Sequence, residues 1–488
     1  MNKSLRLAAL LSLSALAPLA SHAAVHAGEK LYQAHCAACH GVKMEGATGP
    51  SLADQTWLHG APTKANLIKT ISKGVADKGM PPWSPTLSAA QIALLADYVA
   101  PGGAASAAAK PAAIASAASA ATPAATPAAT PATKAAPAEK PVPSLSGFKL
   151  PKGFRISLYA DKVETARSMA VSDSGVVYVG SRKAGKVYAL VDDNKDGVAD
   201  KVITIAEGLQ NPIGVALLNG SLYVAEISRI IRFDNIDASY AAKPAYKVVK
   251  ADLPKETWHG EKFIKAGPDG KIYVPIGAPC NTCNKEEQVY SKIWRMNADG
   301  SNFEEYARGV RNTVGFTWHP VSKEMWFTDN GPDMMGDNSP SCELNVAPKA
   351  GLHFGFPYCH GGVLPDPEFG KLQACEQFVA PVAKLGPHVA PLGLSFYTGT
   401  QFPQQYRNNL FIAEHGSWNR DNKIGYKVSL VTLYNSKVVS TTTFIDGFLR
   451  DGEEVVGRPV DIAVLPDGSM LISDDHGGRV YRVSYEGK

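Results

Sequence analysis

Six segments in the last two thirds of the chain repeat one pattern of strands and turns. Each has an apolar alternating strand, a turn with Gly, Asn or Pro, a second strand of the "YV" type, and usually a third strand. Repeated antiparallel sheets of this period are typical of blades, and six blades close into a β-propeller. A β-sandwich with coincidental turns is the alternative. We therefore expect an all-β six-bladed propeller over residues 146–488, with segments that begin at Ser168, Gly214, Phe263, Val314, Leu392 and Asp461.

A histidine stands at the entrance to the third segment, in "TWHGEKFIKAGPDGKIYV" (257–274). The simplest interpretation of His259 is a surface or capping residue, because a hairpin needs no histidine there. Propellers, however, carry their chemistry in a central channel lined by the ends of the inner strands and their loops. His259 lies just ahead of a predicted inner strand, so we expect it to face the channel.

Composition separates the propeller from an N-terminal segment. Residues 101–145 are nearly all Ala, Pro, Thr, Ser and Lys. Such a segment has almost nothing to bury and cannot offset its own ordering entropy. We expect a linker, extended in part by its prolines, between the propeller and a small domain at residues 24–100.

The first residues predict export. Lys3 and Arg6 precede an apolar core too short to span a bilayer, and small residues precede a cut near Ala23. No later segment is apolar enough for a membrane helix, so residues 1–23 are predicted to be a signal peptide that directs a soluble protein to the periplasm. The net charge of +4, without a basic block, argues against nucleic acid as a partner.

Seven cysteines in an oxidising compartment should form bonds or bind ligands. Cys359 and Cys375 are spaced for a local disulfide. Cys280 and Cys283, in "APCNTCN", favour a tight disulfide, with half of a zinc site as the alternative. Cys342 has no assignment.

The segment "HCAACHG" holds the remaining two cysteines, Cys36 and Cys39, followed by His40. Two thiols at this spacing can add to the two vinyl groups of haem, and the adjacent histidine then binds the iron. A covalently bound haem c is therefore predicted.

The sixth iron ligand is predicted to be Met80, in "GMPPW", with Met44 as the alternative. A thioether favours Fe(II) and suits an electron acceptor. Together with "GPSL" and the closing segment "SAAQIALLADYVA", these motifs resemble the class I cytochromes c over residues 25–100. The resemblance implies a small all-α cytochrome c domain.

An electron acceptor joined to a propeller calls for an electron donor on the propeller side. The sequence holds no strand–GxGxxG–helix unit for nicotinamide. The donor must therefore be another redox cofactor, or the electrons must come from outside the chain.

Residues 150–485 resemble the six-bladed quinoprotein sugar dehydrogenases, a family that includes soluble glucose, aldose sugar and sorbosone dehydrogenases. The motifs are nearest to the sorbosone dehydrogenase branch. They are "WHGEKFIKAGPDGKIYVPIG", "ARGVRNTVGF", "DNGPDMMGDNSPSCELNVAPKAGLHFGFPYC" and "GRPVDIAVLPDGSMLISDD". The resemblance implies pyrroloquinoline quinone (PQQ) with Ca²⁺, and oxidation of an aldose, a sorbosone-like aldehyde or a related sugar. The haem would receive the electrons and pass them to a periplasmic or membrane-bound acceptor.

The resemblance also implies roles for individual residues. Arg311 and Arg458 would pair with carboxylates of PQQ, since a guanidinium binds a carboxylate with two hydrogen bonds. Asn312 would add a neutral donor. The carbonyl groups of Gly331 and Pro332 would bind Ca²⁺, which prefers oxygen ligands.

His259 is implied as the general base that removes the hydroxyl proton of the substrate. The sequence departs from the glucose-oxidising members in three places. Val460 replaces a second arginine, "APCNTC" replaces an acidic turn, and a cofactor-contacting lysine has no clear counterpart, with Arg420 as its substitute.

A separate motif, "DDNKDGVADK", matches the start of an EF-hand loop. Ile203 stands where such a loop ends in a bidentate glutamate. We expect either a structural Ca²⁺ site between strands or a solvated acidic turn, with the site formed by Asp192, Asn194, Asp196 and Asp200.

Two other functions fit a propeller. Six-bladed propellers with a central Ca²⁺ also include lactonases, but a hydrolase has no evident use for a fused cytochrome. A non-catalytic docking propeller would need no combination of His259, Arg311 and Arg458. We therefore expect a dehydrogenase.

Overall fold

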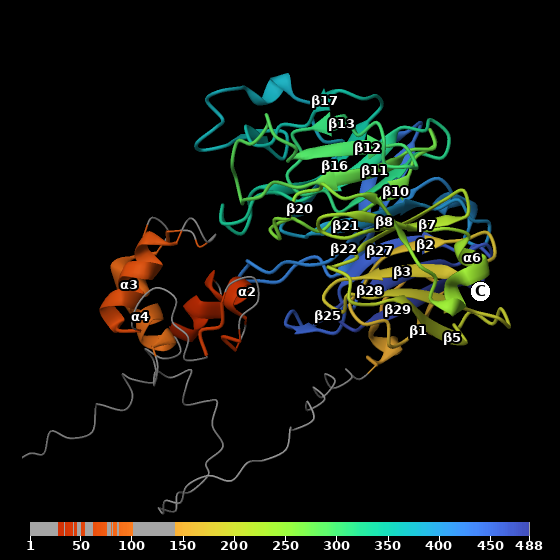
Figure 1. Ribbon diagram of the computed structural model, residues 1–488, viewed down its shortest axis with the longest axis horizontal. Coiled ribbons are helices and arrows are strands. Elements are labelled where there is room, and N and C mark those ends of the chain that lie inside the picture. The colour runs from red at the N-terminus through yellow and green to blue at the C-terminus, as the bar shows by residue number, and fades with distance from the viewer. Residues whose placement is uncertain are drawn as a thin grey trace, which may run out of the picture. The chain divides into compact units, whose positions relative to one another are not determined.

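The computed structural model describes most of the chain (Figure 1). The predicted signal peptide and residues 101–141 of the predicted linker lie outside the described residues. The chain divides into two compact units, Met1–Ala135 and Ala136–Lys488. The described residues are 28–33, 35–41, 43–45, 50–53, 62–75, 80, 82–84, 87–100 and 142–487.

The N-terminal unit is helical, as predicted. Among its described residues, the helices include α2 (Ala37–His40), α3 (Lys64–Lys73) and α4 (Ala89–Val99). Ser88 caps the N-terminus of helix α4: its side chain accepts a hydrogen bond from the Gln91 N–H, and its own backbone N–H donates to Gln91 Oε1. The helix buries one stripe at helical spacing, formed by Ile92, Leu95, Ala96 and Val99.

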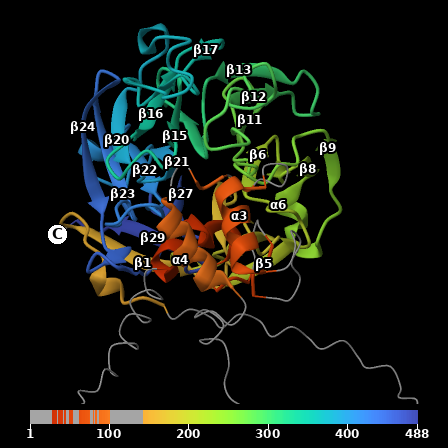
Figure 2. The same ribbon diagram turned by 90° about the vertical axis from the view of Figure 1, so that its left-hand side faces the viewer.

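The C-terminal unit is the predicted six-bladed propeller. Figure 2 shows its sheets arranged in a ring. Blade 1 contains β2 (Ala166–Val171), β3 (Val177–Ser181), β4 (Val187–Val191) and β5 (Lys201–Ala206); blade 2 contains β6 (Gly214–Leu218), β7 (Ser221–Ala225), β8 (Ile230–Phe233) and β9 (Lys247–Lys250). Blade 3 contains β10 (Lys265–Ala266), β11 (Ile272–Ile276), β12 (Lys292–Met296) and β13 (Glu304–Arg308); blade 4 contains β14 (Gly315–Trp318), β15 (Met325–Asp329), β16 (Ser341–Ala347) and β20 (Ala383–Pro387). Blade 5 contains β21 (Pro391–Phe396), β22 (Leu410–Glu414), β23 (Lys427–Tyr434) and β24 (Lys437–Ile445); blade 6 contains β27 (Pro459–Val464), β28 (Met470–Asp474), β29 (Arg479–Tyr485) and β1 (Phe154–Ala160).

The ring is closed by its first strand. β1 pairs antiparallel with β29, so that Phe154 lies opposite Tyr485 and completes blade 6. This pairing joins the two ends of the propeller sequence and leaves no gap in the ring.

The second strand of each blade is buried on both faces, because each blade packs between two neighbours. β3 ("VYVGS") and β28 ("MLISD") are buried along their whole length. The sequences of these strands are therefore mostly apolar without alternation. The outer strand β5, by contrast, is largely exposed.

Strand direction determines where the loops emerge. In a four-stranded antiparallel sheet, the connection into the first strand and the loop between the second and third strands leave at the same end. We call this end of the ring the site face. The loop between the third and fourth strands leaves at the opposite end.

A long insertion separates the last two strands of blade 4. Its first strand, β17 (Leu352–His353), pairs parallel with β13 and so runs along the outer edge of blade 3. The chain continues past it to residues 354–360, which reach the loops beside Arg311. The smaller elements are β18 (Cys359–His360), β19 (Leu364–Pro365), β25 (Leu449–Arg450), β26 (Glu454–Val455), α6 (Ile236–Ser239) and the 3₁₀ turns Leu145–Gly147, Tyr240–Ala242, Cys375–Gln377 and Gln404–Tyr406.

Within the described part of the chain, none of the helices has the length and apolarity needed to cross a membrane.

Candidate functional site

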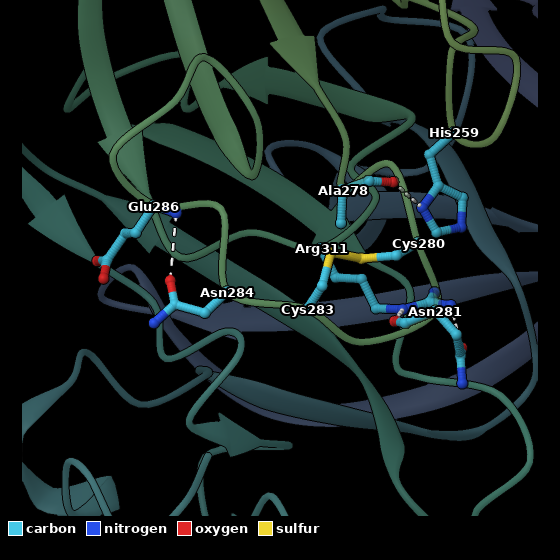
Figure 3. Close-up of a disulfide and its surroundings, with 8 residues drawn as sticks. All are labelled: His259, Ala278, Cys280, Asn281, Cys283, Asn284, Glu286 and Arg311. Carbon is cyan, nitrogen blue, oxygen red and sulfur yellow. Dashed lines mark hydrogen bonds between the residues drawn. A yellow bond between two sulfur atoms is a disulfide. The ribbon is translucent and has the colours of Figure 1, made fainter. Parts of the chain in front are cut away.

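His259 lies on the site face, in the connection between β9 and β10, and is half-buried. Its Nδ1 lies 2.8 Å from the carbonyl oxygen of Ala278 (Figure 3). A carbonyl can only accept, so Nδ1 carries the proton and the neutral ring presents Nε2 as an acceptor. Burial, and then the charge of Arg311, hold the pKa of His259 well below its ordinary value of 6.5.

The backbone around His259 is tightly packed. His259 has a φ of +47°, in the left-handed region that non-glycine residues seldom occupy. A Cβ at Gly277 would lie 2.7 Å from the Cβ of His259, so glycine is needed there. The histidine is therefore held against the end of β11.

Arg311 lies close to His259 and is 2% exposed. Its Nε donates to the Asn281 carbonyl oxygen at 2.8 Å, and Nη2 donates to the Asn281 Oδ1 at 2.7 Å. Nη1 donates to the Asn330 carbonyl oxygen at 3.2 Å, and Nη2 also contacts the Asp333 carboxylate at 3.0 Å. The guanidinium is thus fixed in one orientation by two loops.

The predicted disulfide between Cys280 and Cys283 is confirmed, and it encloses Asn281 (Figure 3). The predicted disulfide between Cys359 and Cys375 is confirmed as well.

The two predicted arginines occupy equivalent places in their blades. The backbone N–H of Arg311 donates to Asp329, at the end of β15, and that of Arg458 donates to Asp474, at the end of β28; both distances are 2.8 Å. Asn312 N–H also donates to Asp329, at 2.7 Å. A carboxylate at the end of the second strand therefore positions each arginine.

The side chain of Arg458 is held by blade 5. Its Nε and Nη2 donate to the carbonyl oxygens of His415 and Gly416, at 3.0 and 2.7 Å, and its guanidinium lies over the ring of Tyr426. Burial lowers the pKa of Arg458 from its usual value.

A charged network that the sequence analysis missed links these residues across the ring. Arg167, at the start of the inner strand β2 and 4% exposed, donates from Nη1 to Asp475 of blade 6 at 2.9 Å. Its Nη2 lies 3.6 Å from Glu261, two residues beyond His259, and Glu261 also pairs with Arg182. Glu261 lies in the connection from β9 to β10, so its ion pair with Arg167 links blade 1 to the entrance of blade 3, which is not its neighbour.

Asp475 also accepts a hydrogen bond from His415 Nε2 at 2.8 Å. Burial lowers the pKa of His415 to about 3, helped by Arg458. Burial alone would raise the pKa of Asp475, but its contacts with His415, Arg167 and Arg458 hold it below its usual value. One sequence signal could have pointed to this network: a charged residue that opens an apolar inner strand, as in "ARSMAV".

Gly331 and Pro332 line a pocket with Arg311, and two buried carboxylates, Asp329 and Glu343, line it too. Burial raises the pKa of both acids, and their mutual repulsion raises that of Glu343 further. Backbone carbonyl and carboxylate oxygens are the ligands that Ca²⁺ prefers. Among the described residues, no three or more His, Cys, Asp or Glu side chains are grouped to hold a metal ion.

Cys342 is a buried free thiol beside this pocket. Backbone N–H groups of Gly331, His388 and Ala390 point at its sulfur, while burial raises its pKa to about 11. The thiol therefore contacts the segment that carries the Gly331 carbonyl.

Arg420 is directed toward the neighbouring loop. Its Nε donates to the Asn422 carbonyl oxygen at 3.1 Å, and its Nη1 donates to the Asp337 carbonyl oxygen. The structure thus places it in a contact between blades 4 and 5.

The acidic loop of blade 1 lies between β4 and β5, at the end opposite the site face. Asn194 Nδ2 contacts Asp196 and Asp200 at 3.2 and 3.3 Å, and Asp192 accepts from the Gly197 N–H at 2.9 Å. The loop is compact, and Ca²⁺ binding there stays a prediction.

In the N-terminal unit, Cys36 precedes α2, and Cys39 and His40 lie within it. His40 Nδ1 lies 2.8 Å from the Pro50 carbonyl oxygen, so Nδ1 carries the proton and Nε2 remains for a metal. Met80 and Cys36 both pack against one core cluster, whereas Met44 is 5% exposed within it.

Comparison with known proteins follows the same division. Residues 148–486 match the family model described as TrAA12-like, and residues 23–99 match the model described as cytochrome c oxidase, cbb3-type, subunit III. A Borreliella burgdorferi protein described as uncharacterized is 37% identical over 358 residues, or 70% of this chain and 92% of that protein. The pyrroloquinoline quinone-dependent pyranose dehydrogenase of Coprinopsis cinerea is 45% identical over 122 residues, or 21% of this chain and 16% of that protein.

The solved holo form of the PQQ domain of pyranose dehydrogenase from Coprinopsis cinerea has the same fold. Its TM-score is 0.61 at 18% identity, over 70% of this chain and 98% of that domain. The TrAA12-like model spans most of the chain, and the N-terminal match agrees with the haem motif. The protein therefore belongs to the TrAA12-like family and carries a cytochrome c domain ahead of its propeller.

Proposed function

We propose that the protein is an exported quinohaemoprotein dehydrogenase that oxidises a sugar or a related aldehyde at the propeller. The observation that carries this proposal is the pair formed by His259 and Arg311: a neutral imidazole with its Nε2 available, beside a guanidinium fixed in one orientation. Family membership and the pyranose dehydrogenase relative support it.

His259 acts as the base. Its Nδ1 proton is engaged by Ala278, so Nε2 accepts the hydroxyl proton of the substrate. Because its pKa is lowered, the ring is neutral and ready to accept at neutral pH.

The cations of the site face suit a ligand with several carboxylates. Arg458 is held by blade 5, Arg167 by Asp475 and Glu261, and Arg311 by two loops, so their orientation is set before a ligand arrives. Arg167 is almost completely buried, and its Nε has no hydrogen-bond partner among the described residues. An unpaired buried N–H of this kind fits an anionic acceptor. Asn312 and Arg420 complete the proposed set of cofactor-binding residues.

A divalent cation fits the pocket beside Arg311. The carbonyls of Gly331 and Pro332, with Asp329 and Glu343, offer hard oxygen ligands. We propose Ca²⁺ there, which would also favour the ionised form of the two acids.

When bound, PQQ supplies a two-electron acceptor and haem a one-electron acceptor. In the N-terminal domain we propose that Cys36 and Cys39 attach the haem, and that His40 and Met80 bind its iron. The domain then carries electrons to a periplasmic or membrane-bound acceptor after export.

The test is haem reduction, followed by visible absorbance, in the full-length chain loaded with haem, PQQ and Ca²⁺. A panel of aldoses and aldehydes is offered. We expect reduction that requires substrate, PQQ and Ca²⁺ together, and that is lost in His259→Gln although PQQ still binds. Failure of the wild-type protein to bind PQQ would overturn the proposal.

A further inference from the structure

We propose that the ring closed by the Cys280–Cys283 disulfide is a positioning element that sets the tautomer of His259 and the orientation of Arg311 together. The inference rests on the proposed function in taking His259 as the base and Arg311 as a cofactor ligand. It concerns the segment 278–283, which we call the disulfide loop (Figure 3).

Ala278, at the start of the disulfide loop, contacts both residues. Its carbonyl oxygen accepts from His259 Nδ1 at 2.8 Å, and its N–H donates to the carbonyl oxygen of Arg311 at 2.8 Å. A displacement of Ala278 therefore changes the hydrogen bond that keeps the proton on Nδ1 and leaves Nε2 free.

Asn281, inside the ring, holds the guanidinium. Its carbonyl oxygen and its Oδ1 accept two parallel hydrogen bonds from Arg311, at 2.8 and 2.7 Å. This is the geometry with which a carboxylate would bind the same edge of the guanidinium. This edge is therefore committed to Asn281, and Arg311 also lines the pocket beside Gly331.

Asn281 also joins the disulfide loop to blade 4. Its Nδ2 donates to the Asp333 carbonyl oxygen, and its Oδ1 accepts from the Asp333 N–H, both at 2.9 Å. The Asp333 carboxylate contacts Arg311 in turn. The contacts of Arg311 and Asp333 thus depend on the position of one side chain, that of Asn281.

The disulfide is the covalent constraint on this position. Between Ile276 and Lys292 the chain forms no helix or strand that could hold Asn281. The ring joins residues only 3 apart, against 16 apart for Cys359–Cys375. Since the closure entropy grows with ring size, the smaller ring adds less to global stability. Its effect is therefore expected to be local.

The test compares two double variants in the full-length chain, without PQQ. The haem is kept ferrous with ascorbate, which leaves disulfides intact. Cys280→Ser/Cys283→Ser opens the disulfide loop, and Cys359→Ser/Cys375→Ser is the matched control. The ring-nitrogen shifts of the histidines, 12 in the sequence, report the tautomer of each, and His259→Gln assigns the signal of His259. PQQ is then titrated in.

In wild type and in the control we expect the Nδ1–H tautomer to predominate. In Cys280→Ser/Cys283→Ser we expect the preference of His259 for the Nδ1–H tautomer to fall toward that of a free imidazole. We also expect the affinity for PQQ to drop about tenfold or more. Asn281→Ser should weaken PQQ binding while the tautomer of His259 stays unchanged, since it removes one arm of the contact. If Cys280→Ser/Cys283→Ser does not fold, the folded Cys359→Ser/Cys375→Ser variant is used instead. A thiol then opens its remaining disulfide, Cys280–Cys283, and reoxidation closes it again.

An unchanged tautomer and an unchanged PQQ affinity in folded Cys280→Ser/Cys283→Ser would overturn the inference. An equal loss in the Cys359→Ser/Cys375→Ser control would overturn it too, because it would indicate general loosening. The tautomer is read without PQQ, so failure of the wild type to bind PQQ would overturn the proposed function and leave this measurement standing.

Discussion

His259 Nδ1 lies 2.8 Å from the carbonyl oxygen of Ala278, so the lone pair of the neutral ring lies on Nε2. Two residues that are 19 apart in the sequence and on different connections thereby define the chemical state of the base. The arrangement has a consequence for the pH dependence of turnover.

Turnover should persist at acidic pH. The base works only when neutral, and burial together with Arg311 lowers its pKa below 6.5. The acid limb of kcat/KM should therefore lie below pH 6.5, with activity present above it and lost as pH falls. A pH profile of substrate-dependent haem reduction measures this limb.

His259→Gln is the control for that profile. It should lower turnover by roughly 10²–10⁴-fold while PQQ still binds, because removal of a general base costs about that much. An acid limb at or above the ordinary pKa, or an unchanged limb in the variant, would assign the titration to another group.

Arg311→Lys should weaken PQQ binding by about 10–100-fold, or roughly 1.4–2.8 kcal/mol. A lysine ammonium cannot donate hydrogen bonds to Asn281, Asn330 and Asp333 at once, so buried acceptors would be left unpaired. This should lower the free energy of unfolding by a further ~1–3 kcal/mol. PQQ titration and urea unfolding measure the two effects. The matched control is Arg155→Lys, where the ion pair with Glu486 is exposed; an equal effect there would contradict the prediction.

Arg167→Met should lower the free energy of unfolding by about 3–5 kcal/mol, because it leaves the buried Asp475 carboxylate without its ion pair. The side chains of Arg167 and Asp475 are 5% and 10% exposed. Removal of the exposed Arg155 by alanine should cost less than about 1 kcal/mol. Urea unfolding followed by circular dichroism distinguishes the two, and similar losses would show that the channel pair contributes no more than a surface pair.

Met80→Ala should remove methionine from the haem iron and lower the reduction potential, since a thioether stabilises Fe(II). Met44→Ala should keep the ligation and lower the free energy of unfolding by about 2–5 kcal/mol, because Met44 is buried in the core. Absorbance of the ferric form and a redox titration measure ligation. If methionine ligation of the iron were lost in Met44→Ala and kept in Met80→Ala, Met44 would be the iron ligand and Met80 the core residue.

Local patterns in the sequence were sufficient for much of the architecture. The strand and turn repeat predicted six blades, and the spacing of Cys280 and Cys283 and of Cys359 and Cys375 predicted two disulfides that the structure contains. Each of these depends on residues close together in the chain. The carboxylates that position Arg311 and Arg458 follow the same repeat, since each ends the second strand of a blade.

The channel network depended on tertiary structure alone. Arg167 meets Asp475, 308 residues away, only because β1 pairs with β29 and closes the ring, and it meets Glu261 only because the blades are arranged around a common centre. Likewise, the insertion of blade 4 reaches the pocket beside Arg311 because β17 runs along blade 3. Sequence periodicity reports which residues share a strand, whereas contacts between blades arise from how the sheets close around a common centre.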